Sequence, residues 1–207
     1  GALQGRGAEY YQKLGYALQK NKKYAEAIDA YLKADTLKPD NIWNNRHLAI
    51  CYRLNRNYQA ALSYYKKVEE ATPEDTNVIF HIGSCLAELG QYEEAANYFF
   101  KLDFIESNCI KAWRGIGWCS FISRKYEQAM KYYEKIIEQK PLAIDYMNAG
   151  HVAWTMGDIQ KAAALYGKSI TANGNRERFL EMFRKDKEAL LKQGIQEEDI
   201  PLMLDLL

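Results

Sequence analysis

The chain has 207 residues, of which 48% are hydrophobic and 27% are charged, and this composition is typical of a folded globular protein rather than of a disordered or membrane-embedded one. Lys and Arg number 28 against 27 Asp and Glu, so the net charge is +1, which excludes the strongly basic balance of most duplex-binding proteins. The sequence has no apolar run as long as a membrane span and no signal-peptide pattern. The chain begins with Gly1 rather than Met, so either Gly1 is an added residue or the sequence starts inside a longer protein, and in both cases the missing signal says little about localisation.

After a short lead segment, residues 1–7, one pattern recurs along the chain up to residue 176. A small residue recurs at spacings of 34, 34, 34 and 33, as Gly15, Ala49, Gly83, Gly117 and Gly150. The same spacings separate Ala27, Ala61, Ala95, Ala129 and Ala162, and also the aromatic residues Tyr31, Tyr65, Phe99, Tyr133 and Tyr166. Chance does not produce such ladders in one register, so we predict five copies of one unit, at 8–41, 42–75, 76–109, 110–142 and 143–176.

The fourth copy shows the structure of the unit. One helix face is marked at i, i+3, i+4 and i+7 by Trp113, Ile116, Gly117 and Ser120. After the short polar break 123–125, a second helix face is marked by Ala129, Tyr133 and Ile136. A break this short makes the two helices antiparallel, and such a hairpin buries its apolar faces only by stacking on copies of itself.

The units resemble tetratricopeptide repeats, whose 34-residue signature has an aromatic residue, a Leu-Gly pair, an Ala-x3-Phe step and a late Pro. The first unit carries this signature as Tyr11, Leu14-Gly15, Leu18, Ala27-x3-Tyr31 and Pro39. The second unit departs from it with Asn45 in place of the aromatic, and the fifth is one residue short and has Gly174 in place of Pro. The resemblance covers about four fifths of the chain. It implies an all-α fold, a right-handed superhelical solenoid of antiparallel helix hairpins with C-terminal capping helices.

The last part of the chain, residues 177–207, is predicted to cap the repeats. We expect one helix from Arg176 to Gln193, with Gly194 as its stop signal, because a repeat array needs a helix to cover its last open face. Its apolar side consists of Phe179, Leu180, Phe183, Leu190 and Leu191. The apolar tail Glu197–Leu207 predicts a short last helix begun by Pro201. This tail either packs against the capping helix or docks into another chain.

The cysteines and the missing catalytic motifs argue against a metal site and an enzyme. Cys51, Cys85 and Cys119 are 34 residues apart, so they occupy one place in successive units, roughly 10 Å apart and too distant for a shared metal ion or a disulfide. We expect them to be buried and reduced, which favours a cytoplasmic location. The sequence has no His-Glu-x2-His, Cys-x2-Cys, Gly-x-Ser-x-Gly or phosphate-loop motif, so we predict no enzymatic activity and no cofactor.

The resemblance implies that the first helices of the units line a concave groove for a peptide or helical segment of another protein. Carried over to this chain, the groove residues are Gln12, Tyr16, Arg46, His47, Arg53, Phe80, His81, Lys111, Arg114, Trp118, Phe121, Met147, His151 and Trp154. In this hypothesis Arg46 and Arg114 hold a carboxylate in fork geometry, and the tryptophans hold an apolar or cationic side chain. The alternative is that these residues only cover and solvate the inner face of the array.

We therefore predict a non-enzymatic scaffold or adaptor for protein–protein interaction. Capture of the acidic tail of heat-shock chaperones is not predicted, because the family's Lys/Asn/Asn/Lys/Arg clamp is replaced by Gln12, Tyr16, His47, Asn77 and His81. The alternative function is a structural spacer or oligomerisation element of a longer multidomain protein, with the apolar tail as its contact. The near-zero net charge disfavours RNA, and no nucleic-acid or membrane partner is predicted. The partner, the pathway and the oligomeric state stay open.

Overall fold

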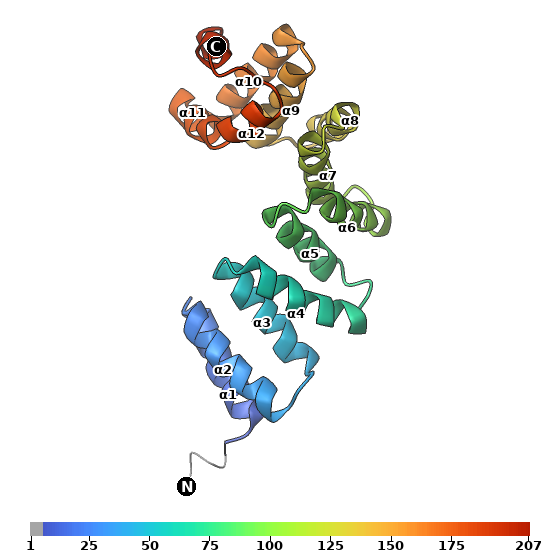
Figure 1. The fold of residues 1–207 in the computed structure, drawn as a ribbon, viewed down its shortest axis with the longest axis vertical. Coiled ribbons are helices and arrows are strands. Elements are labelled where there is room, and N and C mark those ends of the chain that lie inside the picture. The colour runs from blue at the N-terminus through green and yellow to red at the C-terminus, as the bar shows by residue number, and fades with distance from the viewer. Residues whose placement is uncertain (1–5) are drawn as a thin grey trace. The chain divides into compact units, whose positions relative to one another are not determined.

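The structure is a computed structural model that describes residues 6–207, and in this range it has thirteen α-helices and no strand (Figure 1). Residues 1–5 of the predicted lead segment lie outside the described part. The chain divides into two compact units, Gly1–Glu106 and Ser107–Leu207, which we call the N-terminal unit and the C-terminal unit. The predicted all-α fold of helix hairpins is confirmed.

The N-terminal unit consists of three helix hairpins. Its helices are α1 (Ala8–Lys20), α2 (Tyr24–Leu37), α3 (Ile42–Leu54), α4 (Tyr58–Ala71), α5 (Thr76–Glu88) and α6 (Tyr92–Ile105). Each odd-numbered helix packs against the helix that follows it, and α2 and α4 also pack against the first helix of the next hairpin. The second helices therefore bury apolar residues on two sides, which is why an isolated hairpin would not be stable.

The C-terminal unit contains two further hairpins and three short helices. Its helices are α7 (Ile110–Ile122), α8 (Tyr126–Ile137), α9 (Ala143–Thr155), α10 (Ile159–Asn173), α11 (Arg176–Lys185), α12 (Lys187–Lys192) and α13 (Asp199–Asp205). The helix α11 packs against both α9 and α10 and so covers the last hairpin. This is the capping role predicted for the segment after residue 176.

Two predicted boundaries in the cap are wrong. The single helix predicted from 176 to 193 is interrupted at Asp186, which lies between α11 and α12 and whose carboxylate contacts His151 Nε2 at 3.0 Å. The last helix begins at Asp199 rather than at Pro201. Pro201 lies in its first turn, where backbone N–H groups have no acceptor within the helix, so the missing N–H of Pro costs no hydrogen bond. Gly194 is the stop signal as predicted, with φ at 100°.

The glycine ladder has a direct cause in the packing of each hairpin. A Cβ atom at Gly117 would lie 2.8 Å from the Tyr133 ring, and one at Gly83 would lie 2.9 Å from the Phe99 ring. In each case the ring belongs to the second helix of the same hairpin and is almost fully buried, so it has no free space to move into. The small residues and the aromatic residues therefore recur together because they contact each other, one from each helix of the hairpin.

The turn inside each hairpin repeats a backbone conformation that the sequence analysis missed. One residue of each turn has positive φ, and these residues are Lys22, Arg56, Gly90, Arg124 and Gly157. A side chain in this left-handed region costs about 1 kcal/mol, so the three non-glycine turns carry strain. Only two of the five residues are glycine, so residue type does not show that these positions share one conformation. Their spacing along the repeats is the signal that does.

Cys51, Cys85 and Cys119 are buried, as predicted, and none of the three is in a disulfide. Burial raises the pKa of the Cys51 and Cys119 thiols to about 12 and that of Cys85 to about 11, so all three are inert as nucleophiles at neutral pH. Within residues 6–207 no group of three or more His, Cys, Asp and Glu side chains could hold a metal ion. None of the helices described there has the length and apolar character to span a membrane.

Candidate functional site

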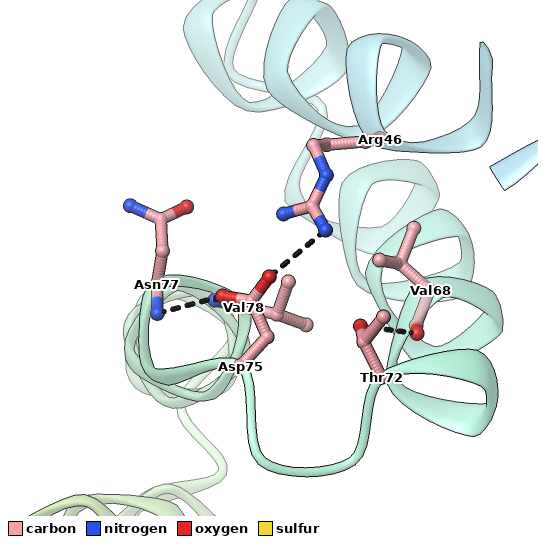
Figure 2. A network of polar contacts seen from close by, with 6 residues as sticks. All are labelled: Arg46, Val68, Thr72, Asp75, Asn77 and Val78. Carbon is pink, nitrogen blue, oxygen red and sulfur yellow. Dashed lines mark hydrogen bonds and ion pairs between the residues drawn. The ribbon is translucent and has the colours of Figure 1, made fainter. Parts of the chain in front are cut away.

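Arg46 of α3 connects its hairpin to the next one. Its Nη2 donates to Asp75 Oδ2 at 2.8 Å, and Asp75 caps the start of α5 by accepting the backbone N–H groups of Asn77 and Val78 (Figure 2). Burial opposes ionisation of Asp75, but the bonds from Arg46 and from the two N–H groups outweigh it and lower the pKa of the carboxyl. The ion pair therefore fixes the loop between α4 and α5 relative to α3.

Arg114 of α7 makes an equivalent but more buried link. Its Nε and Nη2 donate to the two carboxylate oxygens of Asp145 at 2.8 and 2.9 Å, and Asp145 also accepts the backbone N–H of Leu142 at 2.7 Å. The Asp145 side chain is only 1% exposed, whereas Arg114 is 33% exposed. Both Arg46 and Arg114 thus hold carboxylates of their own chain, and the expectation that they are open to a partner's carboxylate is wrong.

Four of the predicted groove residues are not on an open surface. Phe121, Met147, His151 and Trp154 are buried, with at most 7% of each exposed. The ring of Phe183 in α11 contacts the rings of His151 and Trp154, and His151 bonds to the Tyr166 hydroxyl through Nδ1 at 2.6 Å. The chain's own cap covers His151 and Trp154, and Phe121 and Met147 are also buried, so the prediction that these four residues line an accessible groove is wrong.

The cap continues across the same face to the turn between α7 and α8. Gln193, just after α12, donates to the Ile122 carbonyl oxygen and accepts from the Tyr126 hydroxyl. Arg124, in the strained turn, donates to the Lys192 carbonyl oxygen at 3.3 Å. Of the remaining groove residues predicted in this unit, Lys111 is exposed and Trp118 half-buried. The C-terminal segment therefore closes part of the first-helix face of the C-terminal unit.

The N-terminal unit keeps an open pocket on α1 and α3, which we call the aromatic pocket. Its volume is about 430 Å³, and its lining consists of Glu9, Gln12, Lys13, Tyr16, Ala17 and Trp43. Tyr16 and Trp43 are 40% and 41% exposed, and their ring centroids are 6.2 Å apart. Gln12 and Tyr16 were predicted as groove residues, but Trp43 was not. Its spacing of four residues from His47, which places both on one helix face, is the signal that would have found it.

His47 supports the wall of the aromatic pocket. Its ring lies 4.1 Å from that of Trp43, and its Nδ1 is 2.9 Å from Gln19 Oε1, an oxygen that also accepts the Tyr31 hydroxyl. Since an amide oxygen only accepts, Nδ1 carries the hydrogen. Burial, with help from the charges of Arg46 and Lys20, lowers the pKa of His47, so the imidazole is neutral at pH 7.

A second pocket of about 360 Å³ lies on α3 and α5, and we call it the arginine pocket. Its lining consists of Arg53, Leu54, Arg56, Tyr58, Phe80, His81, Ser84, Cys85 and Glu88. The structure thus brings the predicted groove residues Arg53, Phe80 and His81 together. Arg53 Nε donates to the Tyr65 hydroxyl at 3.0 Å, and the Tyr65 ring stacks on His81 at 5.6 Å. Two guanidinium groups against the one carboxylate of Glu88 make this pocket suited to an anionic group.

The chain matches sequence profiles of one family over most of its length. Two profiles described as tetratricopeptide repeat match it, one over residues 53–119 and the other over 8–41, 110–141 and 146–176. No curated protein matches the sequence.

Several solved structures share the fold. YrrB, described as a TPR protein with an unusual peptide-binding site, is 20% identical, with 84% of this chain and 90% of that chain covered and a TM-score of 0.71. MamA from Desulfovibrio magneticus RS-1, from residue 41 to its end, is 16% identical, with 82% and 96% covered and a TM-score of 0.75. A tetratricopeptide repeat protein from Parabacteroides merdae ATCC 43184 is 20% identical, with 96% and 83% covered and a TM-score of 0.63. At these identities the likeness concerns the fold alone.

Proposed function

The chain belongs to the tetratricopeptide repeat family, and from this premise we propose that it is a non-enzymatic scaffold that binds a segment of another protein. The proposed binding surface is the first-helix face of the N-terminal unit, formed by α1, α3 and α5. The proposed ligand is an extended or helical peptide with an apolar side chain and a carboxylate. Since one fold serves many functions, the side chains on this surface determine what the chain binds.

One observation carries the proposal: the first helices are open in one unit and partly closed in the other. In the C-terminal unit, α11 and Gln193 just after α12 already contact first-helix residues, so a peptide would have to displace them. In the N-terminal unit the equivalent face has two pockets of 430 and 360 Å³. Exposed aromatic side chains next to Arg are the usual anchors of protein interfaces.

The two pockets differ in chemistry, which defines what a ligand must offer. The aromatic pocket presents the half-exposed rings of Tyr16 and Trp43 and is suited to an apolar side chain. The arginine pocket presents Arg53 and Arg56 and is suited to a carboxylate. Trp43 and Arg53 are ten residues apart on α3, or roughly 15 Å, a distance that an extended peptide covers in four or five residues.

The test is site-specific photo-crosslinking in cells that produce the protein. A photoreactive phenylalanine derivative replaces Tyr16 in the aromatic pocket or, as a control, Phe104 of α6, which is 91% exposed on a second helix. We expect a partner protein to be crosslinked from position 16 and not from position 104. Equal crosslinking from both positions, or none from position 16, would contradict the proposal.

A second arm tests the arginine pocket without disturbing the fold. Arg56 has φ at 63°, so Arg56→Gly removes a guanidinium group while relieving backbone strain. Lys22→Gly makes the same change in the turn between α1 and α2, where the residue lines neither pocket. We expect Arg56→Gly to lower the yield of crosslinked partner from position 16 about tenfold and Lys22→Gly to leave it unchanged. The same yield from both variants would exclude the arginine pocket from binding.

A further inference from the structure

The last helix and the last hairpin form a cleft in the C-terminal unit, and Trp154 of α9 is one of the residues that line it. The cleft has a volume of about 510 Å³. Trp154 and Met203 are almost fully buried in its lining, whereas Leu202, Leu206 and Ile159 are 63%, 61% and 53% exposed. Three large aliphatic side chains exposed around one cleft form an apolar surface that has no partner within residues 6–207.

The helix α13, which carries two of these leucines, is held firmly in place. Two other side chains of this helix, Ile200 and Met203, are buried. Arg176 donates to the carbonyl oxygens of Leu204 and Leu207 at 3.1 and 3.0 Å and so satisfies the end of the helix. The cleft is therefore preformed, and a ligand would not have to order α13 when it binds.

The rim of the cleft is acidic. Asp199 and Asp205 line it, and both side chains are without an ion pair or hydrogen bond in the described part of the chain. The segment 195–207 contains four acidic residues and no Lys, Arg or His, and only Glu197 among them has a basic partner, Lys187 at 2.7 Å. The two aspartates lie six residues apart, or roughly 9 Å along α13.

We propose that this cleft binds a segment of another protein that inserts an apolar side chain flanked by Lys or Arg on both sides. The apolar side chain would cover Leu202, Leu206 and Ile159, and the flanking cations would pair with Asp199 and Asp205. A helical segment with two basic residues six or seven positions apart matches the spacing of the two aspartates. The same charges disfavour pairing with the same cleft of a second copy and binding to an anionic lipid surface, since both would place negative charge against Asp199 and Asp205.

The experiment selects ligands from a random library of 16-residue peptides displayed on phage, with the whole chain as the target. Peptides are counter-selected on the double variant Leu202→Ala/Leu206→Ala, and those that bind only the parent chain are sequenced. Leu142→Ala, at a leucine of the same unit that is 54% exposed outside the cleft, is the matched control. Circular dichroism melts confirm that all variants keep the stability of the parent, as expected for exposed side chains.

We expect the cleft-dependent peptides to share an aromatic or leucine residue between basic residues. Synthetic copies should bind about tenfold more weakly to Leu202→Ala/Leu206→Ala and several-fold more weakly to Asp199→Asn/Asp205→Asn, with no change for Leu142→Ala. Recovery of no cleft-dependent peptide, or of peptides without excess positive charge, would overturn the proposal. Sedimentation velocity completes the test, because a dimer of the parent that the leucine variant abolishes would identify a second copy as the occupant and also overturn it.

Discussion

Removing the guanidinium group of Arg114 should destabilise the chain more than removing that of Arg46, although the two residues make equivalent links. Asp145 is 1% exposed, so Arg114→Met would leave a buried carboxylate with only the Leu142 N–H as partner. Breaking a buried ion pair costs about 3–5 kcal/mol, and the one-third exposure of Arg114 reduces this to about 2–3 kcal/mol. In the Arg46 pair both side chains are about a quarter exposed, so Arg46→Met should cost only about 0.5–1 kcal/mol.

The assay is urea unfolding followed by circular dichroism, with Met chosen at both sites because it keeps the apolar stem of Arg. Repeat arrays can unfold in parts, so hydrogen exchange of the α9 amides locates the loss. A double-mutant cycle with Asp145→Asn should give a coupling free energy of about 1–2 kcal/mol between Arg114 and Asp145. Two results would show that burial of Asp145 does not determine the strength of the link. One is a free energy of unfolding of Arg114→Met within about 0.5 kcal/mol of the parent, and the other is an equal loss of free energy in Arg46→Met and Arg114→Met.

Two further predictions concern the packing of the repeats and the aromatic pocket. Gly117→Ala should lower the free energy of unfolding by about 1–3 kcal/mol, because its Cβ would lie 2.8 Å from the buried Tyr133 ring. Gly167→Ala in α10 should raise the free energy of unfolding by about 0.5–1 kcal/mol, because its Cβ would have nothing within 4 Å and Ala favours the helix. Equal effects of the two variants in urea unfolding would contradict the role of the ring contact. In an NMR titration of its ring, His47 should titrate below its ordinary pKa of 6.5. Since the unfolded chain binds this proton more readily, the contribution of His47 to stability is present above pH 6.5 and is lost as the pH falls through the lowered pKa. A midpoint at or above 6.5 would contradict the burial of its ring.

The repeating architecture could be predicted from the sequence because it depends on local periodicity. The ladders through Gly83 and Phe99 are 34-residue repeats of a contact inside one hairpin, so they are visible in the chain without any knowledge of its fold. The interruption at Asp186 is not part of this periodicity, and the contact that its carboxylate makes is with His151, 35 residues earlier in the chain. Helical propensity is high on both sides of Asp186 and gives no sign of the break.

The candidate site was predicted less well than the fold, for the same physical reason. The family pattern places Trp154 and Arg114 on the first-helix face, and they are there, but it does not say what else covers that face. Phe183, which covers Trp154, comes from the cap outside the repeats, and Asp145, which pairs with Arg114, is not a residue of the repeat signature. Whether a residue on this face is accessible depends on such long-range contacts, and a single sequence does not encode them in its periodicity.

One position of the repeat shows how the array combines stability with an open surface. At a spacing of 34 residues this position holds Gln12, Arg46, Phe80 and Arg114. Where it is Arg, in α3 and α7, it forms an ion pair with the loop or the first turn that begins the next hairpin. Where it is Gln12 or Phe80, in α1 and α5, it lines one of the two pockets instead. The same place on the first helix therefore links successive hairpins where it is Arg, and it contributes a side chain to a pocket where it is Gln12 or Phe80.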